Sequence, residues 1–227
     1  MTDNNKDLRA GHRERLRQNF LDGKLAKYEL LELLLSYAMP RKDVRPMARM
    51  LFKKFGGIYP ILSACPKELM SVEGVGKNIA TFIKVVQQIM LEGYKCQLEE
   101  QGNILHSPEQ LNNYCLLMLG GKHIEEAHVL YIDVAGRLLQ DELHSTGSID
   151  YTDISTREIV KTALGLDAKF VVLVHNHPKP NCSFSSEDIA MTKKLKQALE
   201  IVGINLHDHY LVSGGIVYSL KETFFNY

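Results

Sequence analysis

The stretch FVVLVHNHPKPNCSFSSED, residues 170–188, decides the fold of this chain. Residues 170–174 form a continuous apolar run, which is typical of a strand buried on both faces. Pro178 and Pro180 end this strand because proline cannot donate a hydrogen bond to a strand ladder. The chain then crosses in a loop to a helix that we expect from Ser186 to about residue 202. This order predicts a sheet covered by helices.

The same stretch carries a set of metal ligands. His175 and His177 are two positions apart at the end of the strand, so alternation places both imidazoles on one face. Asp188 lies in the first turn of the next helix, where its carboxylate can reach back to them. Two imidazole nitrogens and one carboxylate oxygen, with a fourth position open to water, are typical of a catalytic Zn²⁺ site. The simpler interpretation is an ordinary helix start, with Ser185 as N-cap and an acid in the first turn.

The rest of the C-terminal half also alternates between strands and helices. By the period of their apolar residues, we expect strands at residues 127–133, 137–146, 170–174, 209–213 and 216–220, and helices at residues 107–119, 156–166 and 186–202. Strands interleaved with helices in this way predict a mixed β-sheet with helices on its faces.

The N-terminal half has a different pattern, because residues 8–95 are expected to be helical throughout. One helix of this half, residues 44–55, ends at Gly56-Gly57, which is a strong stop signal. A mostly polar run follows the last helix. We therefore predict an α+β protein with an all-helical domain over residues 1–97, a linker over residues 98–104 and a mixed-sheet domain over residues 105–227.

Composition limits the classes of protein that the chain can be. It has 227 residues, 45% of them hydrophobic, which is enough for a core without disulfides. Its four cysteines show no C-x-x-C spacing, and neither a signal peptide nor an apolar run of about 20 residues is present. We expect a soluble, cytoplasmic protein without a membrane segment. Residues 1–100 hold 17 Lys+Arg against 12 Asp+Glu, a basic balance that is compatible with nucleic acid.

A candidate nucleic-acid site lies in the basic half. Residues 71–80, SVEGVGKNIA, resemble a helix-hairpin-helix turn. Gly74 and Gly76 permit a tight turn, free N–H groups at the next helix start can bind a phosphate, and Lys77 adds charge. DNA would be contacted through its backbone phosphates. The alternative is a hairpin that only packs helices.

The whole motif of the C-terminal half is more specific than its parts. His-x-His-Pro, six residues, Ser, two residues, Asp resembles the JAMM motif of the JAB/MPN metalloproteases, and the form His-Asn-His-Pro resembles the bacterial RadC family. The resemblance covers nearly the whole chain through Glu29-Leu30-Leu31, Phe55-Gly56-Gly57, Ser107-Pro108, Tyr131-Ile132-Asp133, Thr146-Gly147, Arg157-Glu158-Ile159, Asp188-Ile189 and Asp208-His209. The sequence departs from it at two places. Lys179-Pro180 stands where the family usually has Ser-Gly, and Phe184 where it usually has Pro.

The resemblance implies roles for these residues. His175, His177 and Asp188 would bind zinc, Ser185 would stabilise the oxyanion, and a glutamate from an earlier strand would be the general base. Glu125 matches that glutamate. Its neighbour Glu126 would point to the opposite face, and Glu142 on the next strand is a third candidate.

One further group lies near the C-terminus. His207 and His209 flank Asp208, which could orient a metal-bound histidine or form a buried structural pair with a histidine.

Two hypotheses follow. The first is a zinc-dependent metallohydrolase of JAMM type that cuts an amide or isopeptide bond in a peptide or protein substrate. The second is a DNA-binding accessory protein of repair or recombination in which the metal site is structural or vestigial.

Overall fold

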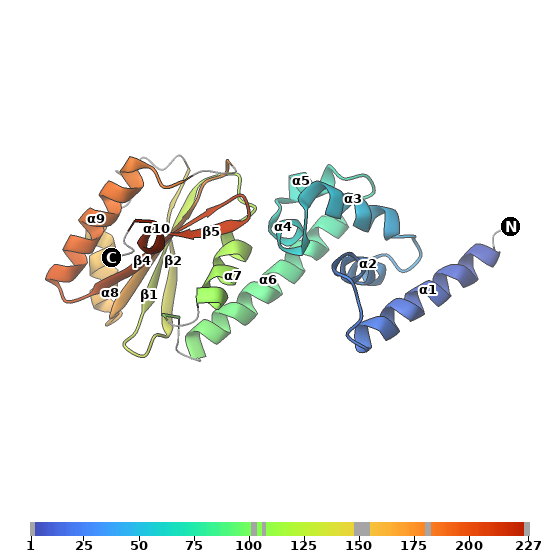
Figure 1. Ribbon diagram of the computed structural model, residues 1–227, viewed down its shortest axis with the longest axis horizontal. Coiled ribbons are helices and arrows are strands. Elements are labelled where there is room, and N and C mark those ends of the chain that lie inside the picture. Colours follow the sequence, from blue (N-terminus) through green and yellow to red (C-terminus); the bar gives the residue numbers. More distant parts are fainter. Residues whose placement is uncertain (1–2, 101–103, 106–107, 148–154, 180–182, 225–227) are drawn as a thin grey trace. The chain divides into compact units, whose positions relative to one another are not determined.

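The computed structural model describes residues 3–100, 104–105, 108–147, 155–179 and 183–224 (Figure 1). The chain forms two compact units, of which the first ends at Val86 and the second begins at Gln87. The first unit is helical and the second contains a sheet, so the α+β class predicted from the sequence is confirmed.

In the described part of the chain, the first unit is built from six helices, the last of which continues into the second unit. They are α1 (Asp3–Leu21), α2 (Lys27–Ala38), α3 (Arg45–Phe55), α4 (Ile58–Ser63), α5 (Pro66–Met70) and α6 (Lys77–Glu100). Helix α3 ends where the sequence predicts, because Gly56 adopts a left-handed conformation with φ of 80° and closes the last turn. Leu35, Leu51 and Ile83 are fully buried and form part of the core of this unit.

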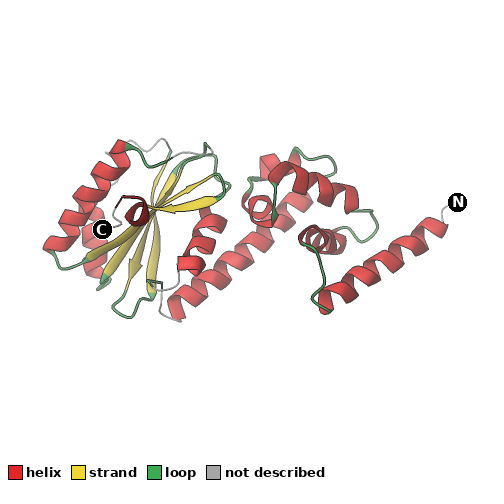
Figure 2. Ribbon diagram, in the orientation of Figure 1, coloured by secondary structure: helices red, strands yellow, loops and turns green. Residues whose placement is uncertain are grey.

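The second unit contains one five-stranded sheet (Figure 2). Its strands are β1 (Glu126–Ile132), β2 (Leu138–Thr146), β3 (Phe170–Asn176), β4 (Asn205–Ser213) and β5 (Ile216–Ser219). Their order across the sheet is β2-β1-β3-β4-β5. The β3–β4 pair is parallel and the other pairs are antiparallel, which makes the sheet mixed as expected. The parallel pair brings the carboxyl ends of β3 and β4 to the same edge.

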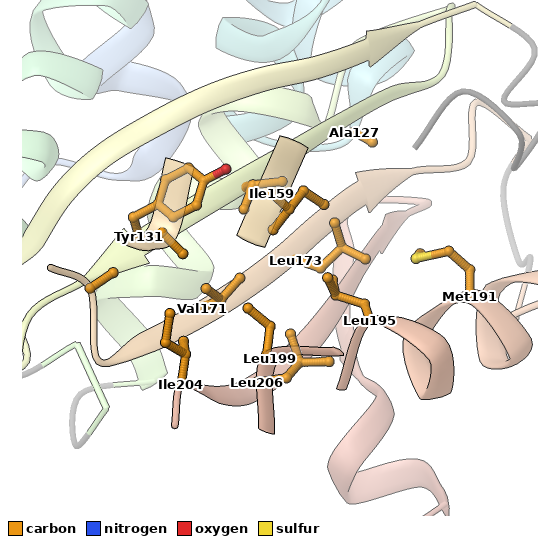
Figure 3. Close-up of a cluster of buried hydrophobic side chains, with 13 residues drawn as sticks. Ala127, Tyr131, Ile159, Val171, Leu173, Met191, Leu195, Leu199, Ile204 and Leu206 are labelled. Carbon is orange, nitrogen blue, oxygen red and sulfur yellow. The ribbon is translucent and has the colours of Figure 1, made fainter. Parts of the chain in front are cut away.

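Helices cover both faces of this sheet. They are α7 (Pro108–Leu119), α8 (Thr156–Gly165), α9 (Ser186–Ile201) and the short α10 (Leu220–Phe224). One face packs against α8 and α9 through Val171 and Leu173 of β3 (Figure 3). The other face packs against α7 through Val172 and Val174. Burial on both faces explains why β3 is a continuous apolar run.

The predicted linker differs from the structure. Residues 98–100 belong to α6, and residues 101–103 lie outside the described part of the chain. Leu91, Tyr94 and Leu98 recur at helical spacing and pack on the core beneath α7, so the end of α6 is part of the second unit. Ile104 is also buried, and its N–H donates to the Gly136 carbonyl at 3.0 Å. Gln97, Glu99 and Glu100 are exposed, as expected for the polar side of an amphipathic helix.

The core of the sheet should be sensitive to truncation at β3. Leu173 is fully buried in the cluster beneath α8 and α9, so Leu173→Ala should lower the free energy of unfolding by about 2–5 kcal/mol. Urea denaturation would measure this as a lower midpoint at unchanged slope. Leu143→Ala on β2 is the matched control, because that side chain is 52% exposed; a comparable loss in both variants would contradict the assignment of the core.

Candidate metal centre

The candidate site is assembled by two neighbouring elements, the end of β3 and the start of α9. His175 is the second-last residue of β3, and the N–H of His177 donates to the Val212 carbonyl of β4 at 3.0 Å. Helix α9 begins after the loop that leaves β3, and Ser185 is its N-cap. The first turn of α9 therefore returns Asp188 to the edge where His175 and His177 lie.

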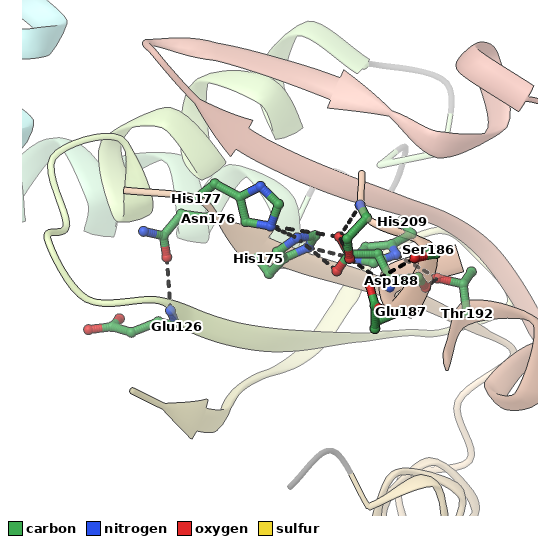
Figure 4. A network of polar contacts seen from close by, with 10 residues as sticks. Glu126, His175, Asn176, His177, Ser186, Glu187, Asp188, Thr192 and His209 are labelled. Carbon is green, nitrogen blue, oxygen red and sulfur yellow. Dashed lines mark hydrogen bonds and ion pairs between the residues drawn. The ribbon is translucent and has the colours of Figure 1, made fainter. Parts of the chain in front are cut away.

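Two imidazole nitrogens and one carboxylate meet at this edge (Figure 4). The Nε2 atoms of His175 and His177 are 3.1 Å apart. The two oxygens of Asp188 lie 3.2 Å from His175 Nε2 and 3.7 Å from His177 Nε2. Ligands at zinc-like bond lengths in a tetrahedron are about 3.3–3.5 Å from one another. The two nitrogens and the carboxylate therefore fit a zinc ion in number, chemistry and separation.

The protonation of the site also suits a cation. His175 and Asp188 are 2% and 1% exposed. Burial, and then the neighbouring His175, lower the pKa of His177, so its imidazole is neutral at neutral pH and has a lone pair to offer. Asp188 places a buried carboxylate beside two imidazoles, and its negative charge would favour a cation bound between these groups.

Ser185 makes the contacts of a helix cap. Its hydroxyl accepts from the N–H of Asp188 at 3.0 Å and donates to the Asp188 carboxylate at 2.7 Å. The Ser185 N–H donates to the same carboxylate oxygen, also at 2.7 Å. This is the reciprocal arrangement of a capping box. The ordinary helix start considered from the sequence is therefore present, and it fixes the orientation of Asp188.

The two adjacent glutamates at the start of β1 have different surroundings. Ala127 pairs with His175, and continued antiparallel pairing brings Glu125 opposite His177. Glu125 lines a pocket with His177, and its charge acts on that histidine. Glu126 begins β1 with the opposite orientation, and its carboxylate lies 3.0 Å from Lys122 Nζ. Strand alternation therefore separates the two, and Glu125 is on the side of the histidines.

Glu142, the third candidate base, is engaged elsewhere on the sheet. It pairs with Val129 across β1 and β2. Its carboxylate accepts a hydrogen bond from the Tyr131 hydroxyl at 2.8 Å. The structure thus brings Glu125 to the histidines and leaves Glu142 beside Tyr131.

The pocket beside the histidines has a volume of about 510 Å³. It is lined by His123, Ile124, Glu125, Gly147, His177, Pro178 and Lys179. The pocket gives the candidate ligand His177 an open side. Lys179, one of the departures from the family pattern, lies on its wall.

Phe184, the other departure, packs over the site. Its ring centroid lies 5.9 Å from that of His175 and 5.1 Å from that of His209. Phe184 is 8% exposed and belongs to a small apolar cluster with Leu211 and Leu220. It therefore shields these two imidazoles from solvent.

The sequence named His209 only as a neighbour of Asp208 and did not point to Thr192, yet both are polar residues of the site. His209 Nε2 lies 2.7 Å from His175 Nδ1, and His209 Nδ1 lies 2.7 Å from the Thr192 hydroxyl. Burial, and then His175, lower the pKa of His209 well below its usual value. Asp208, which the sequence offered as a partner of a histidine ligand, instead accepts from Ser219 at 2.6 Å and supports β5 and α10.

Asn176 was also missed, although it lies between the two histidines. Because alternate residues of a strand face opposite sides, its side chain points away from them toward the segment before β1. Its Oδ1 accepts from the Glu126 N–H at 2.9 Å, and its Nδ2 donates to the Ile124 carbonyl at 3.2 Å. Asn176 therefore fixes the backbone on both sides of Glu125.

Replacing Asn176 should displace Glu125 without removing the metal ligands. Asn176→Ala leaves the Glu126 N–H and the Ile124 carbonyl without this partner, which should lower the stability by about 1–3 kcal/mol. A zinc ion held by His175, His177 and Asp188 would be retained, while any activity that depends on Glu125 should fall. Urea denaturation and metal analysis of the same preparation measure both effects; loss of zinc from a folded variant would show that Asn176 supports the ligands instead.

The candidate phosphate-binding residues lie in the first unit. Gly74 has φ of 84° and makes the turn, Gly76 follows it, and Lys77 is the first residue of α6. A pocket of about 560 Å³ adjoins them, and Arg41 and Lys42 contribute to its wall. These residues are therefore close together, as the hairpin resemblance implies.

Comparison with known proteins gives two results. The family described as the RadC-like JAB domain matches residues 105–225. A UPF0758 protein of Ruegeria pomeroyi is 34% identical over 213 residues, which cover 92% of this chain and 95% of that protein. A UPF0758 protein of Rhodobacter capsulatus is 37% identical over 203 residues, 88% of this chain and 94% of that protein. Among the described residues, no helix is both long and apolar enough to cross a membrane.

Proposed function

Since the chain belongs to the RadC family, we propose that it is a zinc-dependent metallohydrolase of JAMM type that cuts amide or isopeptide bonds. The observation that carries the proposal is the convergence of His175, His177 and Asp188 within 3.1–3.7 Å of one another. The pocket beside His177 supports it, because a hydrolytic site needs an open side for water and substrate.

The residues around the metal would have different roles in the reaction. When bound, zinc supplies a Lewis acid and brings the pKa of water down to about 7. Glu125, on the pocket wall beside His177, would take the proton of the attacking water and return it to the leaving amine nitrogen. Before substrate arrives, the Ser185 hydroxyl donates its single proton to the Asp188 carboxylate. It would turn that proton from the carboxylate to the oxyanion as negative charge develops there.

The pocket supports a class of substrate. Its lining residues come from three separate segments, residues 123–125, Gly147 and residues 177–179. An extended peptide or an isopeptide-linked side chain can lie along such an opening. We therefore expect a peptide or protein substrate.

Metal content and hydrolysis test the proposal together. Protein purified without a His-tag should contain about one zinc per chain by inductively coupled plasma analysis. A panel of fluorogenic peptide and isopeptide amides should reveal a cleavage that a chelator abolishes and added zinc restores. A zinc content well below one per chain that added zinc does not restore would contradict the proposal.

A second candidate function rests on the first unit. We propose that Gly74, Gly76 and Lys77 bind backbone phosphates of DNA, which fits a role in repair or recombination. The pocket beside them, with Arg41 and Lys42 on its wall, supports this. Such binding would deliver the hydrolase to DNA-bound proteins, or it would be the main function if the metal site were structural.

Gly76→Asp should weaken DNA binding at least about tenfold, because a carboxylate at the helix start repels phosphate. Gly76→Ala is the matched control. A Cβ at this position meets nothing within 4 Å, so alanine adds no steric conflict. Fluorescence anisotropy with branched and single-stranded DNA at several salt concentrations would measure the effect. Equal DNA binding by both variants would show that the hairpin does not contact DNA. DNA binding that is retained in His177→Ala would show that it does not depend on the metal site.

A further inference from the structure

A chain of buried polar contacts lies behind His175, on the side away from His177. We propose that His209 and Thr192 are positioning residues that hold His175 in the tautomer whose Nε2 lone pair faces the metal. The inference rests on the proposed function for the presence of that metal, whereas the tautomer follows from the hydrogen bonds between His175, His209 and Thr192.

The last acceptor in this row of contacts, the Asp188 main-chain carbonyl, determines the direction of each hydrogen bond. The Thr192 hydroxyl donates to the Asp188 main-chain carbonyl at 2.6 Å, and a carbonyl can only accept. A hydroxyl has a single proton, so at the next contact, 2.7 Å away, the Thr192 oxygen must accept from His209 Nδ1–H.

The same reasoning continues to His175. A neutral imidazole that carries its proton on Nδ1 has a lone pair on Nε2. His209 Nε2 therefore accepts across the 2.7 Å contact from His175 Nδ1–H. His175 Nε2 is left with its lone pair, and it faces His177 Nε2 at 3.1 Å and Asp188 at 3.2 Å. A histidine ligand needs this state, and its other nitrogen usually donates to a fixed acceptor.

His209 could also be considered a ligand, because one of its nitrogens lies within 4.8 Å of donor atoms of His175 and Asp188. Its contacts argue against this. Nε2 is directed at His175 Nδ1 and Nδ1 at Thr192, so both ring nitrogens are already engaged. His209 is 1% exposed, lies beneath Phe184 and contacts the proposed ligand His175.

These hydrogen bonds also connect the two elements that carry the proposed ligands. Thr192 lies one turn after Asp188 on α9, and its bond to the Asp188 carbonyl links His209 to the helix that carries the third ligand. His209 stands on β4, beside β3. A shift of α9 relative to the sheet would therefore disturb His175 and Asp188 together.

Nuclear magnetic resonance tests the tautomers directly. Long-range ¹H–¹⁵N spectra of the metal-free full chain, at a pH where imidazoles are neutral, should show both His175 and His209 with the proton on Nδ1. In Thr192→Val the hydroxyl is lost, and His209 should no longer hold that tautomer. Thr192→Ser restores the hydroxyl and should restore both signatures.

Zinc affinity provides the second measurement, by competition with a chromophoric chelator. Thr192→Val should bind zinc about 10–100-fold more weakly, as expected for loss of an outer partner of a ligand, and Thr192→Ser should bind like the wild type. A wild-type protein with Nε2–H on His175 or His209 would overturn the inference, even if Thr192→Val did not fold. So would a folded Thr192→Val with wild-type zinc affinity. A wild type that binds no zinc would overturn the proposed function, and the spectra would still decide the tautomer chain.

Discussion

His177→Ala is expected to remove the proposed zinc ion and the proposed amide-hydrolase activity together. His177 is one of the three proposed ligands, and its Nε2 lies 3.1 Å from His175 Nε2 and 3.7 Å from the Asp188 carboxylate. Loss of an outer partner of a ligand already weakens metal binding about 10–100-fold, and loss of a ligand should weaken it more. Metal analysis after gel filtration would measure retention, and His123→Ala, an exposed histidine of the same pocket, should retain zinc.

Thermal unfolding gives an independent measurement of zinc binding by the same variant. A ligand that binds the folded state alone at 100 times its Kd adds about 2.7 kcal/mol to stability. Chelator should therefore lower the Tm of the wild type and leave the Tm of His177→Ala unchanged. A chelator effect of equal size in both proteins would mean that the metal is bound elsewhere.

Much of the site could be predicted from the sequence because its ligands obey local rules. His175 and His177 share a face through strand alternation, and the first turn of α9 carries Asp188. The apolar run of β3 likewise predicts burial on both faces of the sheet. Each of these inferences depends on residues near one another in the sequence.

His209 could not be predicted in this way, because its position depends on strand register. Leu206 packs on the α8 and α9 face, and strict alternation would place Asp208 there too. A register shift follows instead: Val171 pairs with Leu206, but Val172 pairs with Asp208. One extra residue, His207, reverses the alternation and turns His209 toward His175. No local pattern in the sequence marks this irregularity.

The domain boundary was difficult to predict for a different reason, because a local pattern was present but the composition concealed it. Polar residues near the end of α6 are typical of a linker, yet the same segment contains Leu91, Tyr94 and Leu98 at helical spacing. A composition average hides this spacing, since an exposed helix face is as polar as a loop. The core beneath α7 determines which description applies.

Glu125→Gln is expected to lower kcat about 10²–10⁴-fold while zinc stays bound. Glutamine keeps the size of the side chain but cannot accept the proton of the attacking water. Since Glu125 is not among the three proposed ligands, metal content should match the wild type.

Glu126→Gln is the matched control, because the two glutamates are adjacent in sequence and strand alternation separates their side chains. Glu126 contacts Lys122 on the far side, so its replacement should leave kcat nearly unchanged. The fluorogenic amide that the wild type cleaves best would serve as substrate for both variants, with zinc content measured in each. Equal losses in both would indicate a general disturbance of β1, and a loss in Glu126→Gln alone would make Glu126 the base and show that the strand has the opposite phase.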